Sequence, residues 1–277
     1  MTDMLQVEGL NVAFPSRDGP VRVVRDVSFK LGRERLGIVG ESGSGKSQTG
    51  RAILGLTPPS GRVTAERLEF EGIDLRGAPA STWRSLRGRR MSMVMQDPKF
   101  SLNPVMTIGR QIVEAYRRRG TTTRADARAK TIDMLEAVQI RDPERVFAAY
   151  PHELSGGMGQ RAMIAMMLIA EPDLLIADEP TSALDVTVQL DVLRILDDLV
   201  RSRGMGLIFI SHDLRLVSSF CDRVLVMYAG RVVEEIVAKD LHAAKHPYTQ
   251  GLLNCLPRIE GGQRPLQTLT RDAAWLE

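Results

Sequence analysis

The chain has 277 residues, which is room for one large domain or about two of average size. It is 43% hydrophobic and 26% charged, which is typical of a globular protein and argues against disorder. With 37 Lys and Arg against 34 Asp and Glu, the net charge is only +3, and no long basic block occurs. Nucleic acid is therefore not an expected partner.

The sequence also argues against a membrane span and a disulfide framework. Its longest uninterrupted apolar run, Ala162–Ala170, is far shorter than the roughly 18 residues that a span needs. Polar residues interrupt the start of the chain, so no signal region is expected. Two cysteines, Cys221 and Cys255, are too few for a disulfide framework or a Cys-rich zinc site. We expect a soluble protein of the reducing cytosol.

Strands are predicted to dominate the first third of the chain. Leu5–Phe14 and Val21–Leu31 are rich in β-branched residues and flank a turn over 15–20. The other elements expected here are a short strand over Leu36–Val39, a helix over 46–56 and a strand pair over 62–75, around Glu71-Gly72.

The middle of the chain has helical composition, over 108–119, 124–138 and 159–170. The remainder alternates between buried strands and helices. These elements are a strand over Leu174–Ala177, a helix over Val186–Arg201, a strand over Gly206–Ile210, a helix from Leu214 and a strand over Arg223–Tyr228. Such alternation predicts an α/β fold with helices on the faces of a parallel sheet.

The residues from Gly40 to Ser47 match the pattern GxxxxGK[ST], between a predicted strand and a predicted helix. Glycines let backbone N–H groups turn inward around phosphate oxygens, and the helix adds its positive N-terminal end. Lys46 supplies a charge for the β- and γ-phosphates, and Ser47 a hydroxyl ligand for Mg²⁺. An ordinary Gly-Ser loop is the alternative that this context disfavours. The expected nucleotide-binding residues are Gly40, Ser42, Gly43, Ser44, Gly45, Lys46 and Ser47.

Two carboxylates, Asp178 and Glu179, come directly after the predicted strand Leu174–Ala177. Asp178 suits Mg²⁺, directly or through water, and Glu179 is positioned to orient and polarise an attacking water. The alternative is an acidic turn at a helix N-terminus, where carboxylates are also stabilising. The phosphate loop in the same chain favours the catalytic interpretation.

Four further segments resemble motifs of the ATP-binding cassette (ABC) ATPases, over about residues 4–250. They are a signature motif at 154–161, Ser182-Ala183-Leu184-Asp185, a switch-histidine segment at 210–213 and a glutamine loop at 95–98. The resemblance implies a phosphate-loop NTPase core with a mostly parallel sheet. It also implies an N-terminal antiparallel β subdomain and an inserted α-helical subdomain at about 97–165.

The resemblance also implies roles for individual residues. Gln96 would contact Mg²⁺ and the water and link the nucleotide to a transmembrane partner, and His212 would bond the γ-phosphate. Phe14 would stack on adenine, although a core position is its alternative, as a structural histidine is for His212. Ser155, Gly156 and Gly157 would contact the γ-phosphate held by an opposite subunit, and Asp185 would lie at that interface. A head-to-tail dimer with two ATP molecules between its subunits follows.

Details of the sequence resemble the oligopeptide, dipeptide and nickel import branch of the family. Met158 stands in the signature where Gln is commoner, and 246–249 read His-Pro-Tyr-Thr, like the start of that branch's C-terminal extension. The cassette is thus expected over 1–245 and the extension over 246–277. Some members hold an iron–sulfur cluster there, but Cys255 is the single cysteine of this stretch, so we expect no cluster. His152, His242 and His246 have no convincing set of neighbouring ligands.

The expected function is that of an ATPase subunit that powers an importer of peptides or similar small solutes, with nickel and opines as alternatives. The resemblance implies two permease subunits, a second cassette (paralogue or self), an extracytoplasmic solute-binding protein and a peripheral place on the cytoplasmic side of the inner membrane. A soluble cassette ATPase without a permease and a regulatory module that hydrolyses poorly are the competing hypotheses. The substrate, the direction of transport and the choice between homodimer and heterodimer stay open.

Overall fold

The structure, a computed structural model, describes residues 3–95, 101–181, 184–255 and 275. The chain divides into two compact units, of which the first combines Met1–Arg76 with Phe209–Glu277 and the second is Gly77–Ile208. In these described ranges, no helix is both long enough and apolar enough to cross a membrane.

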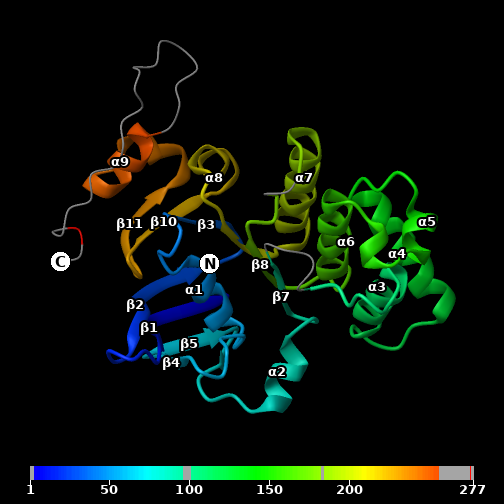
Figure 1. The fold of residues 1–277 in the computed structure, drawn as a ribbon, viewed down its shortest axis with the longest axis horizontal. Helices are drawn as coiled ribbons and strands as arrows, with labels where there is room; N and C mark the ends of the chain where they lie inside the picture. Colours follow the sequence, from blue (N-terminus) through cyan, green and yellow to red (C-terminus); the bar gives the residue numbers. More distant parts are fainter. Residues whose placement is uncertain (1–2, 96–100, 182–183, 256–274, 276–277) are drawn as a thin grey trace, which may run out of the picture. The chain divides into compact units, whose positions relative to one another are not determined.

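The first unit begins with an antiparallel sheet in the order β2-β1-β5-β6, with β4 paired to β1 (Figure 1). Side chains of β1 alternate between buried and half-buried, and the alternation shifts by one residue at Gly9, which has a φ of +61° at a β-bulge. The predicted N-terminal antiparallel sheet is therefore confirmed. Its strands are β1 (Leu5–Phe14), β2 (Val21–Leu31), β4 (Arg62–Thr64), β5 (Arg67–Phe70) and β6 (Ile73–Asp74).

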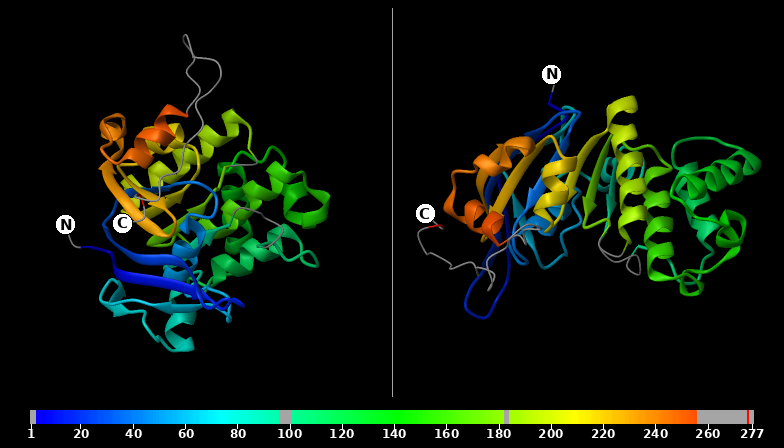
Figure 2. Two further views of the ribbon diagram at one scale, coloured as in Figure 1. Left: turned by 60° about the vertical axis from the view of Figure 1, so that its left-hand side comes forward. Right: turned by 90° about the horizontal axis from the view of Figure 1, so that it is seen from above.

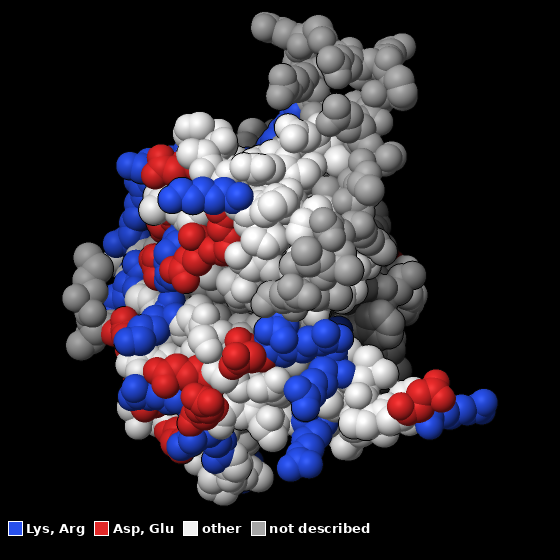
Figure 3. Space-filling model, turned by 90° about the vertical axis from the view of Figure 1, so that its left-hand side faces the viewer, with Lys and Arg blue, Asp and Glu red and all other residues white. Residues whose placement is uncertain are grey.

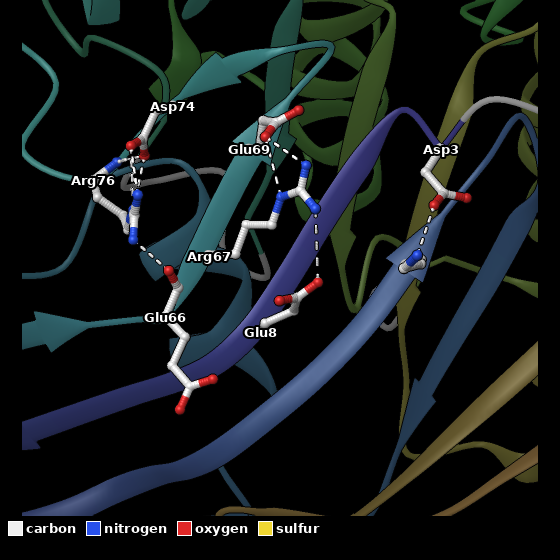
Figure 4. A network of polar contacts seen from close by, with 8 residues as sticks. Asp3, Glu8, Glu66, Arg67, Glu69, Asp74 and Arg76 are labelled. Carbon is white, nitrogen blue, oxygen red and sulfur yellow. Dashed lines mark hydrogen bonds and ion pairs between the residues drawn. The ribbon is translucent and has the colours of Figure 1, made fainter.

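Ion pairs join side chains on and beside the strands of this sheet (Figure 4). Arg67 bonds Glu69 at 2.9 Å and approaches Glu8 on the neighbouring strand at 3.9 Å. Asp74 and Arg76 form a further pair at 2.8 Å, which holds the pKa of Asp74 at about 2, first through the side-chain hydrogen bond from Arg76. Consistent with such pairing, acidic and basic side chains are interleaved over much of the face drawn in Figure 3.

The second sheet of the first unit has the order β11-β10-β3-β9, with β3 and β10 parallel and β10 and β11 antiparallel. Helix α1 contacts β1 and β2 on one side, while its Thr49 lies against Met227 of β10 on the other. The unit's core is therefore shared between the two sheets and α1. These elements are β3 (Arg35–Val39), α1 (Lys46–Ile53), β9 (Gly206–Ile210), α8 (Leu214–Phe220), β10 (Arg223–Tyr228), β11 (Arg231–Val237), a 3₁₀ turn (Ala238–Ala243) and α9 (Pro247–Asn254).

The second unit contains the strands β7, β8 and the start of β9, of which β7 and β8 are parallel. Every residue of β8 is buried, as expected for a parallel strand covered on both faces. Helices α3 to α6 pack on one another, and Figure 2 shows them grouped together in green. The elements are α2 (Ala80–Leu86), β7 (Met91–Val94), α3 (Ile108–Arg117), α4 (Arg124–Ala137), α5 (Pro143–Ala148), a 3₁₀ turn (Pro151–Glu153), α6 (Gly156–Leu168), β8 (Leu174–Asp178) and α7 (Val186–Arg203).

Candidate nucleotide site

The predicted phosphate loop joins β3 to α1, and two of its glycines lie where no side chain fits. Gly40 has a φ of +150°, and a Cβ there would lie 2.2 Å from the Met227 carbonyl oxygen. Gly45 has a φ of +98°, and its Cβ would lie 2.5 Å from the carbonyl oxygen of Val23. Backbone atoms of two other strands therefore hold the loop at both ends, and glycine is required for this close approach.

The side chain of Lys46 turns back into the loop that precedes it. The residue is only 7% exposed, and its Nζ donates to the carbonyl oxygens of Gly40 at 2.7 Å and Glu41 at 2.8 Å. A buried ammonium needs such partners, because desolvation of an unpaired charge is costly. The loop thus holds one positive charge beside the N-terminal end of α1, which is a favourable place for an anion.

His212 follows β9 in the same unit as the phosphate loop. The backbone N–H of Ser211 donates to the carbonyl of Ile38, near the end of β3, at 3.2 Å. Strands β3 and β9 therefore end side by side, and the phosphate loop and His212 leave the sheet at the same edge. Asp213 caps α8 by accepting from two backbone N–H groups, and the His212 side chain is exposed. This histidine is therefore not part of the core.

Phe14, the other predicted residue of the first unit, is the last residue of β1 and is half-buried. A Cβ added at Gly61 would lie 2.7 Å from its ring atom Cε1, so one side of the ring packs on that glycine. The ring is therefore only partly a core residue.

In the second unit, Asp178 and Glu179 lie where β8 ends. Asp178 is the last residue of the strand and only 4% exposed, whereas Glu179 is half-buried with a φ of +48°. A non-glycine residue in this conformation is uncommon and is often found at functional sites. The buried Gln160 of α6 donates from Nε2 to the Pro180 carbonyl at 2.8 Å, which ties the turn after the two carboxylates to the signature helix.

The signature residues form the start of α6. Ser155 caps this helix by accepting from the N–H of Met158 at 3.4 Å, and Gly156 is exposed with open space around its Cβ position. Asp185 caps α7 in the same way, from the N–H of Val188 at 3.1 Å. Ser155 and Asp185 line a common groove of roughly 500 Å³, which also has Arg141, Arg145 and Arg161 in its wall.

Gln96, Ser182 and Ala183 lie outside the described residues, as does most of the predicted extension 246–277. The histidines have local structural contacts: His246 Nδ1 accepts from the N–H of Tyr248 at 3.2 Å, and His152 stacks on Tyr150. Among the described residues, no group of three or more His, Cys, Asp and Glu could hold a metal ion.

Sequence reasoning did not assign a role to Tyr248. Its hydroxyl accepts a hydrogen bond from the backbone N–H of Glu41, in the phosphate loop, at 3.0 Å. The His-Pro-Tyr-Thr segment is visible in the sequence, but its contact joins residues that are 207 positions apart, which no local pattern reveals. Gln160 was likewise visible only as part of a motif.

Comparison with known proteins identifies the class. The ABC transporter family model matches residues 24–182. The dipeptide transport ATP-binding protein DppD of Haemophilus influenzae is 47% identical over 268 residues, which are 96% of this chain and 81% of that protein. The oligopeptide transport ATP-binding protein OppD of Escherichia coli is 44% identical, over 96% of this chain and 79% of its own.

Solved structures agree on the fold. The dimeric structure of a bacterial ABC transporter cassette matches with a TM-score of 0.77 at 24% identity, over 85% of this chain and 99% of that one. The chain belongs to the ABC transporter family. It is the ATP-binding and ATP-hydrolysing member of such a transporter, and its phosphate loop and α/β core confirm the predicted phosphate-loop NTPase fold.

Proposed function

We propose that this chain binds Mg-ATP and hydrolyses it between two cassettes, and that the cycle drives import of peptides through separate permease subunits. The observation that carries the proposal is the buried Lys46 ammonium, held inside a glycine-rich loop at the start of α1. A loop of this kind offers a charge and several N–H donors to phosphate oxygens. The residues of the loop, Gly40 and Ser42 to Ser47, then hold the triphosphate.

The side chains of Ser47 and Asp178 are of the kind that magnesium prefers. Ser47 offers a hydroxyl directly after Lys46, and Asp178 offers a carboxylate at the end of β8. These are hard oxygen donors, and Mg²⁺ is commonly held by one or two protein groups together with substrate phosphates. A site of this kind needs no cluster of three protein ligands. The metal would neutralise charge on the β- and γ-phosphates, with Gln96 as a further oxygen donor.

For hydrolysis we assign Glu179 to the attacking water, with Gln96 and His212 as its catalytic neighbours. Positive φ turns the backbone sharply at Glu179, directly after the buried Asp178. A carboxylate in that place can accept a proton from water as it attacks phosphorus, a role that contributes typically about 10²–10⁴-fold. The exposed His212 would donate to the γ-phosphate and keep the water in line.

We infer a head-to-tail dimer from the two anion sites of one chain. The start of α6 is a helix N-terminus at which Ser155 and Gly156 are exposed and Gly157 is half-buried, with open space around the Cβ position of Gly156. It would receive the γ-phosphate bound to the opposite cassette's loop, with Asp185 at the interface. Phe14 would stack on the adenine of the ATP bound to its own loop. The second cassette is either a copy of this chain or a paralogue.

Peptide import is the transport function that the relatives support. The matched proteins are named as dipeptide and oligopeptide transport ATP-binding proteins, and they match almost the whole of this chain. We therefore propose two permease subunits and an extracytoplasmic solute-binding protein as partners, with this chain peripheral on the cytoplasmic side of the inner membrane. Coexpression with candidate permease subunits and capture of an intact complex would test it. Recovery with ribosomes instead would favour a cassette ATPase without a permease.

Two substitutions test the nucleotide chemistry. Lys46→Ala should weaken ATP binding about 10- to 100-fold in calorimetry, since a charge-assisted contact to the phosphates is lost. Glu179→Gln should keep Mg-ATP binding, lose about 10²–10⁴-fold in phosphate release and accumulate the ATP-bound dimer. Lys130→Ala and Glu136→Gln, both on the exposed side of α4, are matched controls that should behave as wild type. Normal ATP affinity for the first variant, or normal turnover for the second, would contradict the assignment.

A further inference from the structure

Tyr248 lies on α9, in the C-terminal segment, and its side chain is completely buried. A buried tyrosine hydroxyl normally has a hydrogen-bond partner. Here the hydroxyl accepts from the backbone N–H of Glu41, the second residue of the phosphate loop, at 3.0 Å. Both residues belong to the first unit, so this contact lies within one compact body.

The same peptide group is held from its opposite side by Lys46. The N–H of Glu41 and the C=O of Gly40 belong to one planar peptide, and Lys46 Nζ donates to that carbonyl oxygen at 2.7 Å. Tyr248 therefore fixes one edge of the plane and Lys46 binds the other. A rotation of this peptide would break both hydrogen bonds together, so the tyrosine hydroxyl helps to set where the lysine ammonium lies.

The ring of Tyr248 is itself held in place by several groups. The ring centroid of Tyr228 on β10 is 4.5 Å away, and that of Trp275 is 5.7 Å away. His246 caps the helix that carries Tyr248, and Glu234 on β11 accepts from the backbone N–H of Lys245 at 2.7 Å. Because packing fixes the ring, removal of the hydroxyl should break the bond from Glu41 and leave the ring in place.

We infer that Tyr248 is a positioning residue for nucleotide binding and that α9 is part of the support of the phosphate loop. The inference rests on the proposed role of the loop and adds a C-terminal residue to it. The hydroxyl keeps the Gly40–Glu41 peptide in the orientation that holds Lys46 inside the loop. Without it the loop has more conformations to lose when phosphate binds, which lowers affinity.

The test is Tyr248→Phe in the full chain, with Tyr228→Phe as the matched control. Both variants lose one hydroxyl from the same aromatic cluster, but only Tyr248→Phe loses the hydrogen bond from Glu41. In calorimetry at a temperature where circular dichroism shows both variants folded, Tyr248→Phe should bind ATP and ADP about two- to tenfold more weakly. KM for ATP should rise by the same factor with kcat within about twofold, whereas the control should match wild type.

A second measurement needs no nucleotide. The Glu41 amide should exchange with deuterium several-fold faster in Tyr248→Phe than in wild type or the control, because its acceptor is gone. Unchanged affinity together with unchanged exchange would overturn the role of Tyr248 while leaving ATP binding intact. Absence of ATP binding by the wild-type chain would instead overturn the proposed function, and the exchange data would still report on the hydrogen bond.

Discussion

Two glycines of the phosphate loop, Gly43 and Gly45, allow a matched test of how the loop is held. Both have positive φ, +82° and +98°, so alanine at either position carries a similar conformational cost. Their surroundings differ. A Cβ at Gly43 would meet no atom within 4 Å, whereas a Cβ at Gly45 would lie 2.5 Å from the Val23 carbonyl oxygen. The pair therefore separates backbone strain from packing.

The expected magnitudes follow from these geometries. An alanine forced into positive φ costs about 1–3 kcal/mol, and Gly43→Ala should lose that much free energy of unfolding. At Gly45 the Cβ must move by about 1 Å to reach an ordinary contact distance, against a carbonyl in a paired strand. Overpacking of this kind costs a further 1–3 kcal/mol or so. Gly45→Ala should therefore be the less stable variant by about that difference.

Urea unfolding can measure the difference in the unit concerned. The chain has two tryptophans, and Trp83 lies in the second unit while Trp275 lies beside Tyr228 in the first. In a Trp83→Phe background, tryptophan fluorescence excited selectively thus follows Trp275 alone. Equal unfolding free energies for the two alanine variants, within about 0.5 kcal/mol, would refute the argument that Val23 restricts the loop.

Two further predictions concern the second unit. Burial raises the pKa of Glu171, but hydrogen bonds from Arg203 and Arg119 outweigh burial, so the pKa lies below its usual value of 4.5. The ion pairs of Glu171 therefore stabilise the fold above about pH 4.5, and this stabilisation is lost as the pH falls through the folded pKa. Glu171→Gln should therefore lower Tm at pH 7, and an unchanged deficit at about pH 3.5 would contradict this sign. Gly109→Ala places a Cβ 2.3 Å from the Phe147 ring and should lower the free energy of unfolding in urea by about 1–3 kcal/mol. Adding Phe147→Leu should restore part of this loss. Wild-type stability of Gly109→Ala alone would rule out the clash.

The elements that the sequence predicts best are those whose signal is local. The predicted segments Val21–Leu31, Gly206–Ile210 and Arg223–Tyr228 coincide with strands of the structure, because runs of β-branched and apolar residues between turns favour strands. The helix expected from 159 begins at Gly156 instead. The low helix propensity of glycine argues against a helix over Gly156 and Gly157, whereas the N-cap of Ser155 favours one that begins there.

Elements that depend on partners were missed. Strand β11 has no regular alternation of buried and exposed residues, and it forms because Ala229-Gly230, both with positive φ, turn the chain back along β10. Helix α5 is too short for a periodic pattern, although Asp142 before Pro143 is a local start signal that was available.

The candidate site also combines features with a local sequence signal and features that depend on distant residues. The phosphate loop, the carboxylates after β8 and the signature are contiguous motifs, so their residue types could be found from sequence alone. The contacts that hold the phosphate loop in place cannot be found in this way. Gly45 packs on Val23 and Glu41 bonds Tyr248, and each partner lies outside the motif. The motif thus specifies which residues can form the phosphate loop, whereas residues outside the motif determine how rigidly the loop is held. Two chains with identical phosphate loops can therefore differ in nucleotide affinity, and in this chain the C-terminal helix is a place where such a difference would arise.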